Sequence, residues 1–327
     1  MSKTYTENEA AELMERMLKG EMEESEMEAL LIELADRGET VEEITGMAKV
    51  MREFVNPVRG FEKAVDTCGT GGSGLQRVNT STMTAFVLAA GKVPVAKHGN
   101  RAASGRCGSF DVLEKLGAKI ELDPKQVEET LNTLGIGFMF APFYHPAMKY
   151  VMPVRKKLKR RTVFNLLGPL TNPASVRRQI LGVSDLESGK KMIEVLKNLG
   201  HERVMVVHGS DGLDELTITG KSDVFELKNG NLIFYEFDPQ TIGIKPVSFK
   251  DIEGGDSKQN AEIFDGVMTG DVSGPVRDLV LLNSAAGFLL TDKARTMEEG
   301  YELALSALDT GKAYDLFHKY ISLSHRV

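Results

Sequence analysis

A glycine-rich segment from Asp66 to Gly74 has the composition of an anion-binding loop. Glycines let backbone amides approach an anion without interference from a Cβ atom. The segment precedes residues 79–82, where Ser81 and Thr82 add hydroxyls at a predicted helix start, whose unpaired N–H groups attract phosphate. A tight strand–helix connection would also explain the glycines, and the segment lacks the Gly-Lys-Ser/Thr end of a P-loop and the G-x-G-x-x-G spacing. The hydroxyl-rich helix start favours a phosphate site.

A second polar loop runs from residue 97 to residue 109, directly after the apolar run 93–96. It lies about 28 residues beyond the first loop and also follows a predicted strand. Open α/β sheets bind their ligands at the carboxyl ends of strands, so two such loops predict a ligand with several phosphates. Its cations are Lys97, Arg101 and Arg106, and its hydrogen-bond donors are Asn100, Ser104 and Ser109, the last of which is also expected to cap a helix over 110–116.

Carboxylates gather in a third loop, which follows a predicted strand over 203–208 and carries Asp211, Asp214 and Glu215. Adjacent carboxylates beside a polyphosphate are the usual oxygen ligands of Mg²⁺. By itself the loop would be interpreted as a solvated acidic turn. Beside two phosphate loops it predicts a magnesium site.

A fourth segment joins His145 and Arg155 to a basic run over 155–161 and to residues 162–173. For the lysines of that run and Arg160, an exposed helix face is the favoured interpretation. Arg155 is treated separately as a candidate ligand-binding cation.

The elements that position these loops fall into two blocks. Residues 1–60 are predicted to be helical, with apolar residues at helical spacing and glycines at 20 and 38 as helix ends. Capping boxes are predicted at Thr6, Ser25 and Thr40, each followed three residues later by glutamate. From residue 64, short apolar runs alternate with helical segments, which indicates a mostly parallel sheet with crossover helices. Helices are also predicted over 146–173 and 274–327, and a β-rich segment over 222–250 with a turn at 229–230.

Composition excludes several function classes. The 327 residues include 40 Lys and Arg against 47 Asp and Glu, a net charge of −7, which argues against binding nucleic acid through phosphate neutralisation. Residues 1–60 hold 15 acidic and 7 basic residues, a net charge of −8, so the other 267 residues are close to neutral. No apolar run is long enough to span a bilayer, so we expect a cytoplasmic protein with no membrane partner. Cys68 and Cys107 lie in glycine loops, where neither is expected to form a disulfide or a zinc site.

Taken together, these segments resemble the anthranilate phosphoribosyltransferase family of tryptophan biosynthesis, in the family's order and spacing from residue 66 to residue 215. The resemblance implies an α/β fold, in which a large domain with a mostly parallel central sheet flanked by helices accompanies a small all-helical domain. The small domain would comprise residues 1–63 and the helices of about 146–172, and the large domain residues 64–145 and 173–327. It further implies Mg²⁺-dependent transfer of the phosphoribosyl group from phosphoribosyl pyrophosphate to the amine of anthranilate, in a homodimer joined through the small domain.

The resemblance and the two loops give three groups of candidate residues. Phosphoribosyl pyrophosphate would meet Gly69, Gly72, Ser73, Arg77, Asn79, Thr80, Ser81, Thr82, Lys97, Asn100, Arg101, Ser104, Gly105 and Ser109. Anthranilate would meet Gly69, His98, Asn100, His145 and Arg155, with Arg155 facing its carboxylate. The Mg²⁺ ligands would be Ser81, Asp214 and Glu215.

Two positions depart from the family pattern. The family usually has aspartate where this chain has Ser73, and threonine where it has Arg77, which adds a positive charge near the pyrophosphate. These departures keep open an acceptor that is a related aromatic amine. The sequence is also compatible with a pyrimidine nucleoside phosphorylase-like enzyme and with a non-enzymatic relative that binds nucleic acid. No side chain is assigned as a general acid or base, because positioning and electrostatics can carry most of such a transfer.

Overall fold

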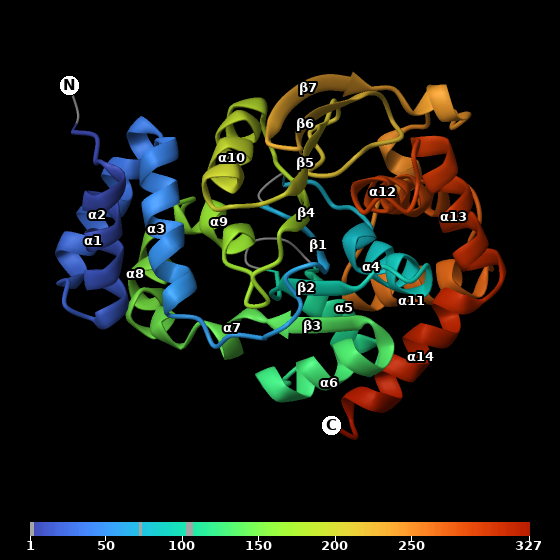
Figure 1. Cartoon of the computed structure of the whole chain (residues 1–327), viewed down its shortest axis with the longest axis horizontal. Coiled ribbons are helices and arrows are strands. Elements are labelled where there is room, and N and C mark those ends of the chain that lie inside the picture. The colour runs from blue at the N-terminus through green and yellow to red at the C-terminus, as the bar shows by residue number, and fades with distance from the viewer. Residues whose placement is uncertain (1–2, 72–73, 103–106) are drawn as a thin grey trace.

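The fold is described from a computed structural model that covers residues 3–71, 74–102 and 107–327. Within these residues, one sheet of seven strands crosses the centre of the molecule in the order β3-β2-β1-β4-β5-β6-β7 (Figure 1). The first five strands of that order pair in parallel, and β6 and β7 are antiparallel, which confirms the predicted mostly parallel α/β sheet. The strands are β1 (Val65–Gly69), β2 (Val95–Gly99), β3 (Ile136–Phe140), β4 (Arg178–Gly182), β5 (Arg203–Gly209), β6 (Ser222–Lys228) and β7 (Asn231–Phe237).

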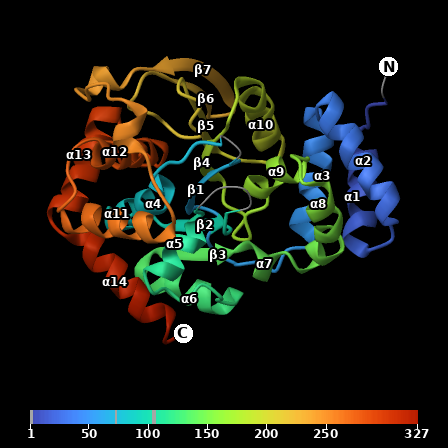
Figure 2. The same cartoon turned by 180° about the vertical axis from the view of Figure 1, so that it is seen from behind.

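Helices from the second half of the chain cover one face of the sheet together with α4, as both views show (Figures 1 and 2). Nearly every residue of α4 is buried, because its sequence is apolar or threonine all round. The Phe86 ring lies 5.4 Å from that of Phe138 and 5.7 Å from that of Phe264, which joins α4 to the sheet and to α11. None of the described helices is long and apolar enough to cross a membrane. The helices of this layer are α4 (Thr80–Ala90), α11 (Ser257–Thr269), α12 (Pro275–Leu290), α13 (Met297–Asp309) and α14 (Lys312–Ser324).

The N-terminal helices form a separate group at the other end of the molecule (Figure 1). Their core includes Met14 and Leu31 and continues into Val154 and Phe164, so the segment that begins near residue 146 returns to pack against them. Buried side chains of α10 and of the sheet complete this core. The helices on this side are α1 (Glu7–Lys19), α2 (Glu24–Arg37), α3 (Val41–Glu53), α8 (Met152–Leu158), α9 (Phe164–Leu167) and α10 (Leu186–Asn198). The 3-10 turn η1 (Pro146–Tyr150) directly precedes α8.

Two of the three predicted capping boxes are present. Thr6 and Thr40 accept from the backbone of the glutamate three residues later, and each glutamate bonds back. The prediction at Ser25 is wrong, because α2 already begins at Glu24 and its N-cap residue, Glu23, makes no side-chain cap. Ser25 therefore lies inside the first turn, where the neighbouring acidic side chains already complement the helix dipole.

The sequence did not predict β3, whose five residues are all buried and show no alternation. It did predict the β6–β7 hairpin, whose turn residues Asn229 and Gly230 both have positive φ, at 53° and 77°. Strand β7 forms one edge of the sheet and exposes Leu232, Ile233 and Phe234. The remaining helices are α5 (Ser109–Lys115), α6 (Pro124–Leu134) and α7 (Ala141–Tyr144), with 3-10 turns η2 (Gly168–Leu170), η3 (Pro239–Ile242) and η4 (Phe249–Ile252).

Candidate functional site

Two glycines let the acidic loop pass across the ends of the central strands. Gly69 ends β1 and pairs with Gly182 at the end of β4. A Cβ atom on Gly69 would lie 2.3 Å from Asp214 Oδ2, and one on Gly182 would lie 1.6 Å from the Asp214 carbonyl oxygen. Any side chain at either position would displace Asp214, so both glycines are required for the carboxylate to reach the glycine-rich loop.

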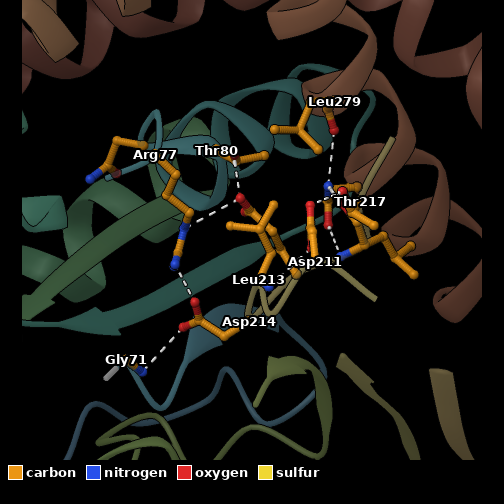
Figure 3. A network of polar contacts seen from close by, with 12 residues as sticks. Gly71, Arg77, Thr80, Asp211, Leu213, Asp214, Thr217 and Leu279 are labelled. Atoms are coloured by element: carbon orange, nitrogen blue, oxygen red, sulfur yellow. Dashed lines mark hydrogen bonds and ion pairs between the residues drawn. The ribbon is translucent and has the colours of Figure 1, made fainter. Parts of the chain in front are cut away.

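Asp214 and Glu215 are both buried and share one cation, Arg77 (Figure 3). Arg77 Nη1 forms an ion pair with Asp214 Oδ1, and its Nε lies 3.3 Å from Glu215 Oε1. The Gly71 N–H donates to Asp214 Oδ2 at 3.1 Å, and the Thr80 hydroxyl donates to Glu215 Oε1 at 3.3 Å. We refer to Arg77, Asp214 and Glu215 as the Arg77 cluster.

The Arg77 cluster sets two carboxyl groups against one guanidinium. Burial raises the pKa of Glu215 to about 7, although the attraction of Arg77 opposes that rise. Burial disfavours the charged guanidinium, but Asp214 and Glu215 outweigh it and raise the pKa of Arg77 overall. Arg77 therefore stays charged, and it cannot balance two ionised carboxylates by itself.

The loop that carries these carboxylates is fixed by its own polar contacts. Asp211 accepts from the hydroxyls of Thr217 and Thr219, each at 2.6 Å, so its carboxylate serves the loop and not a ligand (Figure 3). Asn283 of α12 bonds both backbone groups of Leu216, accepting at 3.2 Å and donating at 2.9 Å. The role of Asn283 was not predicted from the sequence, because it lies 67 residues further along the chain.

Lys97 lies beneath the strand ends. Its ammonium donates to the carbonyl of Thr67 on the neighbouring strand and is almost fully buried. Burial lowers its pKa, while the nearby Asp66 acts in the opposite direction. Asp66 in turn accepts from the amide of Asn172 at 2.8 Å and from the His98 N–H at 3.3 Å. Asp66 and Asn172 were not predicted as positioning residues, although both lie in the segments that carry the motifs.

His98 and His145 form a buried pair. Their Nε2 atoms are 3.2 Å apart, which fits a hydrogen bond in which one ring donates and the other accepts. Burial lowers the pKa of His145 to about 4, and burial together with His145 holds the pKa of His98 well below its usual range. Both rings are therefore neutral near pH 7, and they present a surface without charge.

Arg155 is the cation of the fourth segment. It lies on α8 with its guanidinium 5.3 Å from the centre of the Phe164 ring, and burial lowers its pKa. Among the residues that the structure describes, no carboxylate pairs with Arg155. A half-buried guanidinium stacked on a ring in this way is suited to a carboxylate on a ligand.

The other candidate residues are more dispersed. Asn79 precedes α4 and accepts from the Thr82 hydroxyl at 2.5 Å, and Asn100 accepts from the Arg101 N–H at 2.8 Å. Arg101 is exposed and pairs with Glu114 at 3.0 Å. The prediction that Ser109 caps a helix is wrong, since Gly108 is the N-cap residue of α5, whose Asp111 accepts from the Gly108 N–H. Gly72, Ser73, Ser104 and Gly105, together with Arg106, lie outside the described residues.

A cavity of about 30 Å³ lies at the strand ends. Its lining includes Gly69, Ser81 and the three residues of the Arg77 cluster. Two carboxylates and the Ser81 hydroxyl form an all-oxygen donor set of the kind that Mg²⁺ prefers. The described residues contain no cluster of three His, Cys, Asp or Glu side chains suited to a metal. Because Mg²⁺ often takes one or two carboxylates and completes its shell with waters and substrate oxygens, this donor set fits a Mg²⁺ that arrives with a phosphate.

Comparison with known proteins gives consistent results. The glycosyl transferase family a/b domain matches residues 61–314, and the helical bundle domain of that family matches residues 2–55. A protein of Rhodopseudomonas palustris strain TIE-1 named anthranilate phosphoribosyltransferase is 48% identical, over 98% of this chain and 95% of its own.

Two solved structures named anthranilate phosphoribosyltransferase are also similar. That of Thermus thermophilus has a TM-score of 0.93 and 42% identity, over 99% of this chain and 97% of its own. That of Saccharomyces cerevisiae, solved in complex with PRPP and Mg, has a TM-score of 0.90 and 25% identity, over 98% of this chain and 94% of its own.

Proposed function

Because the chain belongs to the anthranilate phosphoribosyltransferase family, we propose that it transfers the phosphoribosyl group of phosphoribosyl pyrophosphate to the amine of anthranilate. One observation carries the proposal. Gly69 at the end of β1, Ser81 in the first turn of α4 and the acidic pair after β5 line the same cavity. A glycine loop, a helix start and a carboxylate pair in one place are suited to a magnesium pyrophosphate group.

In the proposed reaction the amine nitrogen bonds to C1 of the ribose, and pyrophosphate leaves with the electron pair of the C1–O bond. One amine proton is released, and no side chain of this protein is assigned to accept it. The phosphate-binding role falls to the start of α4, where Asn79, Ser81 and Thr82 would hold the pyrophosphate oxygens. Lys97 would add a fixed positive charge from beneath the strand ends, where burial strengthens its field.

The acceptor would be held by groups from the other segments. Arg155 would face the carboxylate of anthranilate, because it is half-buried and makes no ion pair with the described residues. His98 and His145 would contact the aromatic ring as neutral side chains. Gly69 and Asn100 would complete the contact with the acceptor between the two loops.

Mg²⁺ would be held by Asp214, Glu215 and Ser81, and it would neutralise the negative charge that grows on the leaving pyrophosphate. The yeast relative was solved with PRPP and Mg, which supports this assignment. We also propose that the enzyme is a cytoplasmic homodimer. Its small domain would comprise residues 1–63 and about 146–172 and would form the dimer contact, and residues 64–145 and 173–327 would form the large domain. Light scattering on the purified protein measures the oligomeric state directly.

The fluorescence of anthranilate tests the reaction. It should fall when phosphoribosyl pyrophosphate and Mg²⁺ are added to the enzyme, and stay constant when either is omitted. A matched assay replaces the substrates with thymidine and inorganic phosphate. Turnover of thymidine without loss of anthranilate would support a nucleoside phosphorylase, and salt-sensitive DNA binding without turnover would support a nucleic-acid-binding relative.

A further inference from the structure

The guanidinium of Arg77, one of the two positions at which the sequence suggests a departure from the family pattern, contacts both carboxylates of the proposed metal site. It bonds Asp214 Oδ1 and lies 3.3 Å from Glu215 Oε1. Asp214 Oδ2 accepts from the Gly71 N–H, and Glu215 Oε1 also accepts from Thr80. Within the part of the chain that the structure describes, only Glu215 Oε2 among these four oxygens has no hydrogen-bond or ion-pair partner. Three of the four carboxylate oxygens that could coordinate a metal therefore already have a partner in the protein.

The backbone holds Arg77 in this position. Arg77 forms an isolated antiparallel bridge with Glu253, and the Gly254 N–H donates to the Gln76 carbonyl at 3.3 Å. The two segments are in such close contact that a Cβ atom on Gly254 would lie 2.1 Å from the Arg77 carbonyl oxygen. Main-chain contacts therefore help to position the Arg77 guanidinium, in addition to its attraction to the two carboxylates.

Space at the site also favours the guanidinium over a hydrated ion. The cavity beside Arg77 measures about 30 Å³, which is room for roughly one or two waters. Mg²⁺ gives up its waters reluctantly and usually keeps several of them. A hydrated Mg²⁺ could enter between Asp214 and Glu215 only if the Arg77 side chain moved out.

We propose that Arg77 takes the place of one divalent cation at the Asp214–Glu215 pair, so that the ligand-free chain binds no metal there. This inference deepens the proposed function, because the same carboxylates would face the magnesium pyrophosphate group. Its test does not depend on turnover, since metal binding to the ligand-free protein can be measured directly. Mn²⁺ is a suitable probe, because it prefers the same oxygen ligands and free Mn²⁺ is counted by its electron paramagnetic resonance signal.

The experiment titrates Mn²⁺ into four ligand-free proteins. Wild type should bind none at the pair, and Arg77→Gln should gain one Mn²⁺ per chain. The Mn²⁺ affinity of Arg77→Gln should be at least on the order of 100-fold above the upper bound that the wild-type titration sets, because a unit positive charge has left the site. The double variant Arg77→Gln/Asp214→Asn should lose that gain, since only one carboxylate remains. Arg37→Gln, which frees the buried Glu43 far from the loops, should bind no Mn²⁺ and so shows that a freed carboxylate is not sufficient.

Two results would overturn the inference. One is a wild-type protein that binds one Mn²⁺ at the pair as tightly as Arg77→Gln does, and the other is an Arg77→Gln protein with wild-type circular dichroism that gains none. If Arg77→Gln does not fold, Arg77→Lys keeps the charge with a single contact point and should bind Mn²⁺ more tightly than wild type; equal affinity would again overturn the inference. Absence of anthranilate turnover in wild type, with the Mn²⁺ pattern intact, would remove the proposed function and leave this inference standing.

Discussion

Two clusters in which an arginine contacts buried carboxylates differ in the number of those carboxylates. In the N-terminal helices, Arg37 pairs with one carboxylate, that of Glu43, and its Nη1 donates to Oε2 at 2.9 Å. Glu43 also accepts from the backbone N–H groups of Tyr5 at 2.8 Å and Thr40 at 2.9 Å. At the strand ends, Arg77 faces two buried carboxylates. In the first cluster one carboxylate faces one guanidinium, and in the second two carboxyl groups face one guanidinium.

The pKa values follow this difference. Burial opposes ionisation of Glu43, but Arg37 and the two backbone donors lower its pKa overall. Burial of Glu215 is not offset to the same extent, and its pKa rises to about 7. A buried pair of one carboxylate and one guanidinium leaves no charge for a ligand to neutralise. An unbalanced one costs stability that a cationic ligand can restore, which is the expected property of a binding site.

The largest effect should come from breaking the balanced pair. Glu43→Gln leaves the Arg37 guanidinium, whose side chain is 10% exposed, without its hydrogen-bonded carboxylate, which should lower the free energy of unfolding by about 3–5 kcal/mol. Urea unfolding measures this, and kcat/KM of the protein that remains folded should stay near the wild-type value. A loss of stability under about 1 kcal/mol would show that the Arg37–Glu43 pair contributes no more than an exposed ion pair.

Removing one carboxylate from the Arg77 cluster should have the opposite pattern, with a large loss of activity and little loss of stability. Asp214→Asn should reduce kcat/KM by about 10²–10³-fold, the usual effect of losing one group that stabilises transition-state charge. Its free energy of unfolding should change by less than about 1 kcal/mol, because Arg77 still pairs with Glu215. Steady-state kinetics and urea unfolding on the same preparation check both values. Kinetics within a few-fold of wild type would remove Asp214 from the metal site.

Acid sensitivity should arise where the two regions meet. His201 is buried near Arg52 of α3, and burial, with the charge of Arg52, lowers its pKa from 6.5 to about 3. The unfolded chain therefore takes up a proton below pH 6.5 that the folded chain refuses, so this contribution to stability is present above pH 6.5 and falls with the pH.

His201→Gln should flatten that dependence. Relative to the variant, wild type should lose about 2–3 kcal/mol of unfolding free energy between pH 6.5 and about pH 4.5. Urea unfolding across this range measures the slope, and the exposed His318→Gln variant should match wild type. Parallel curves for wild type and His201→Gln would contradict a neutral, buried His201.

The smallest effect is expected at a third arginine, Arg155, which pairs with no carboxylate among the described residues. Arg155→Ala should raise the KM for anthranilate by about 10–100-fold, the worth of a hydrogen bond to a charged group. The KM for phosphoribosyl pyrophosphate should stay within about twofold, because the proposed pyrophosphate site is formed by other segments of the chain. Lys157→Ala on the same helix, whose ammonium is exposed and pairs with Glu28 at 2.5 Å, should change neither constant. Equal increases in both KM values would mean that Arg155 does not face the acceptor.

The sequence predicted the parts of the fold that depend on local pattern. Alternating apolar and helical runs located the strands after residue 64, and Thr6 and Thr40 act as caps because capping chemistry involves only four neighbouring residues. Strand β3 was missed because all five of its residues are buried, so its sequence has no two-residue alternation. Ser109 was misplaced by one residue, since Gly108 with its extended backbone is also a good N-cap residue.

The sequence offered candidate residues for the site, and it did not predict the contacts that those residues make. Arg77 was recognised as a departure from the family, but its partner Asp214 lies 137 residues away, and no local pattern links them. Asn283 and Asn172 were missed for the same reason, because each acts on a segment distant in sequence. Ordinary asparagines carry no signal of their own until the fold brings them to a backbone group or a carboxylate.

The separation between Arg77 and Asp214 also has a consequence for synthesis on the ribosome. At about 5–20 residues per second, the 137 intervening residues take roughly 7–27 s to add. For most of that interval β4, which pairs with β1 in the sheet, has not been made, and the acidic loop is added last. Until residue 214 is added, the nascent chain therefore carries Arg77 without the carboxylates that it meets in the folded protein.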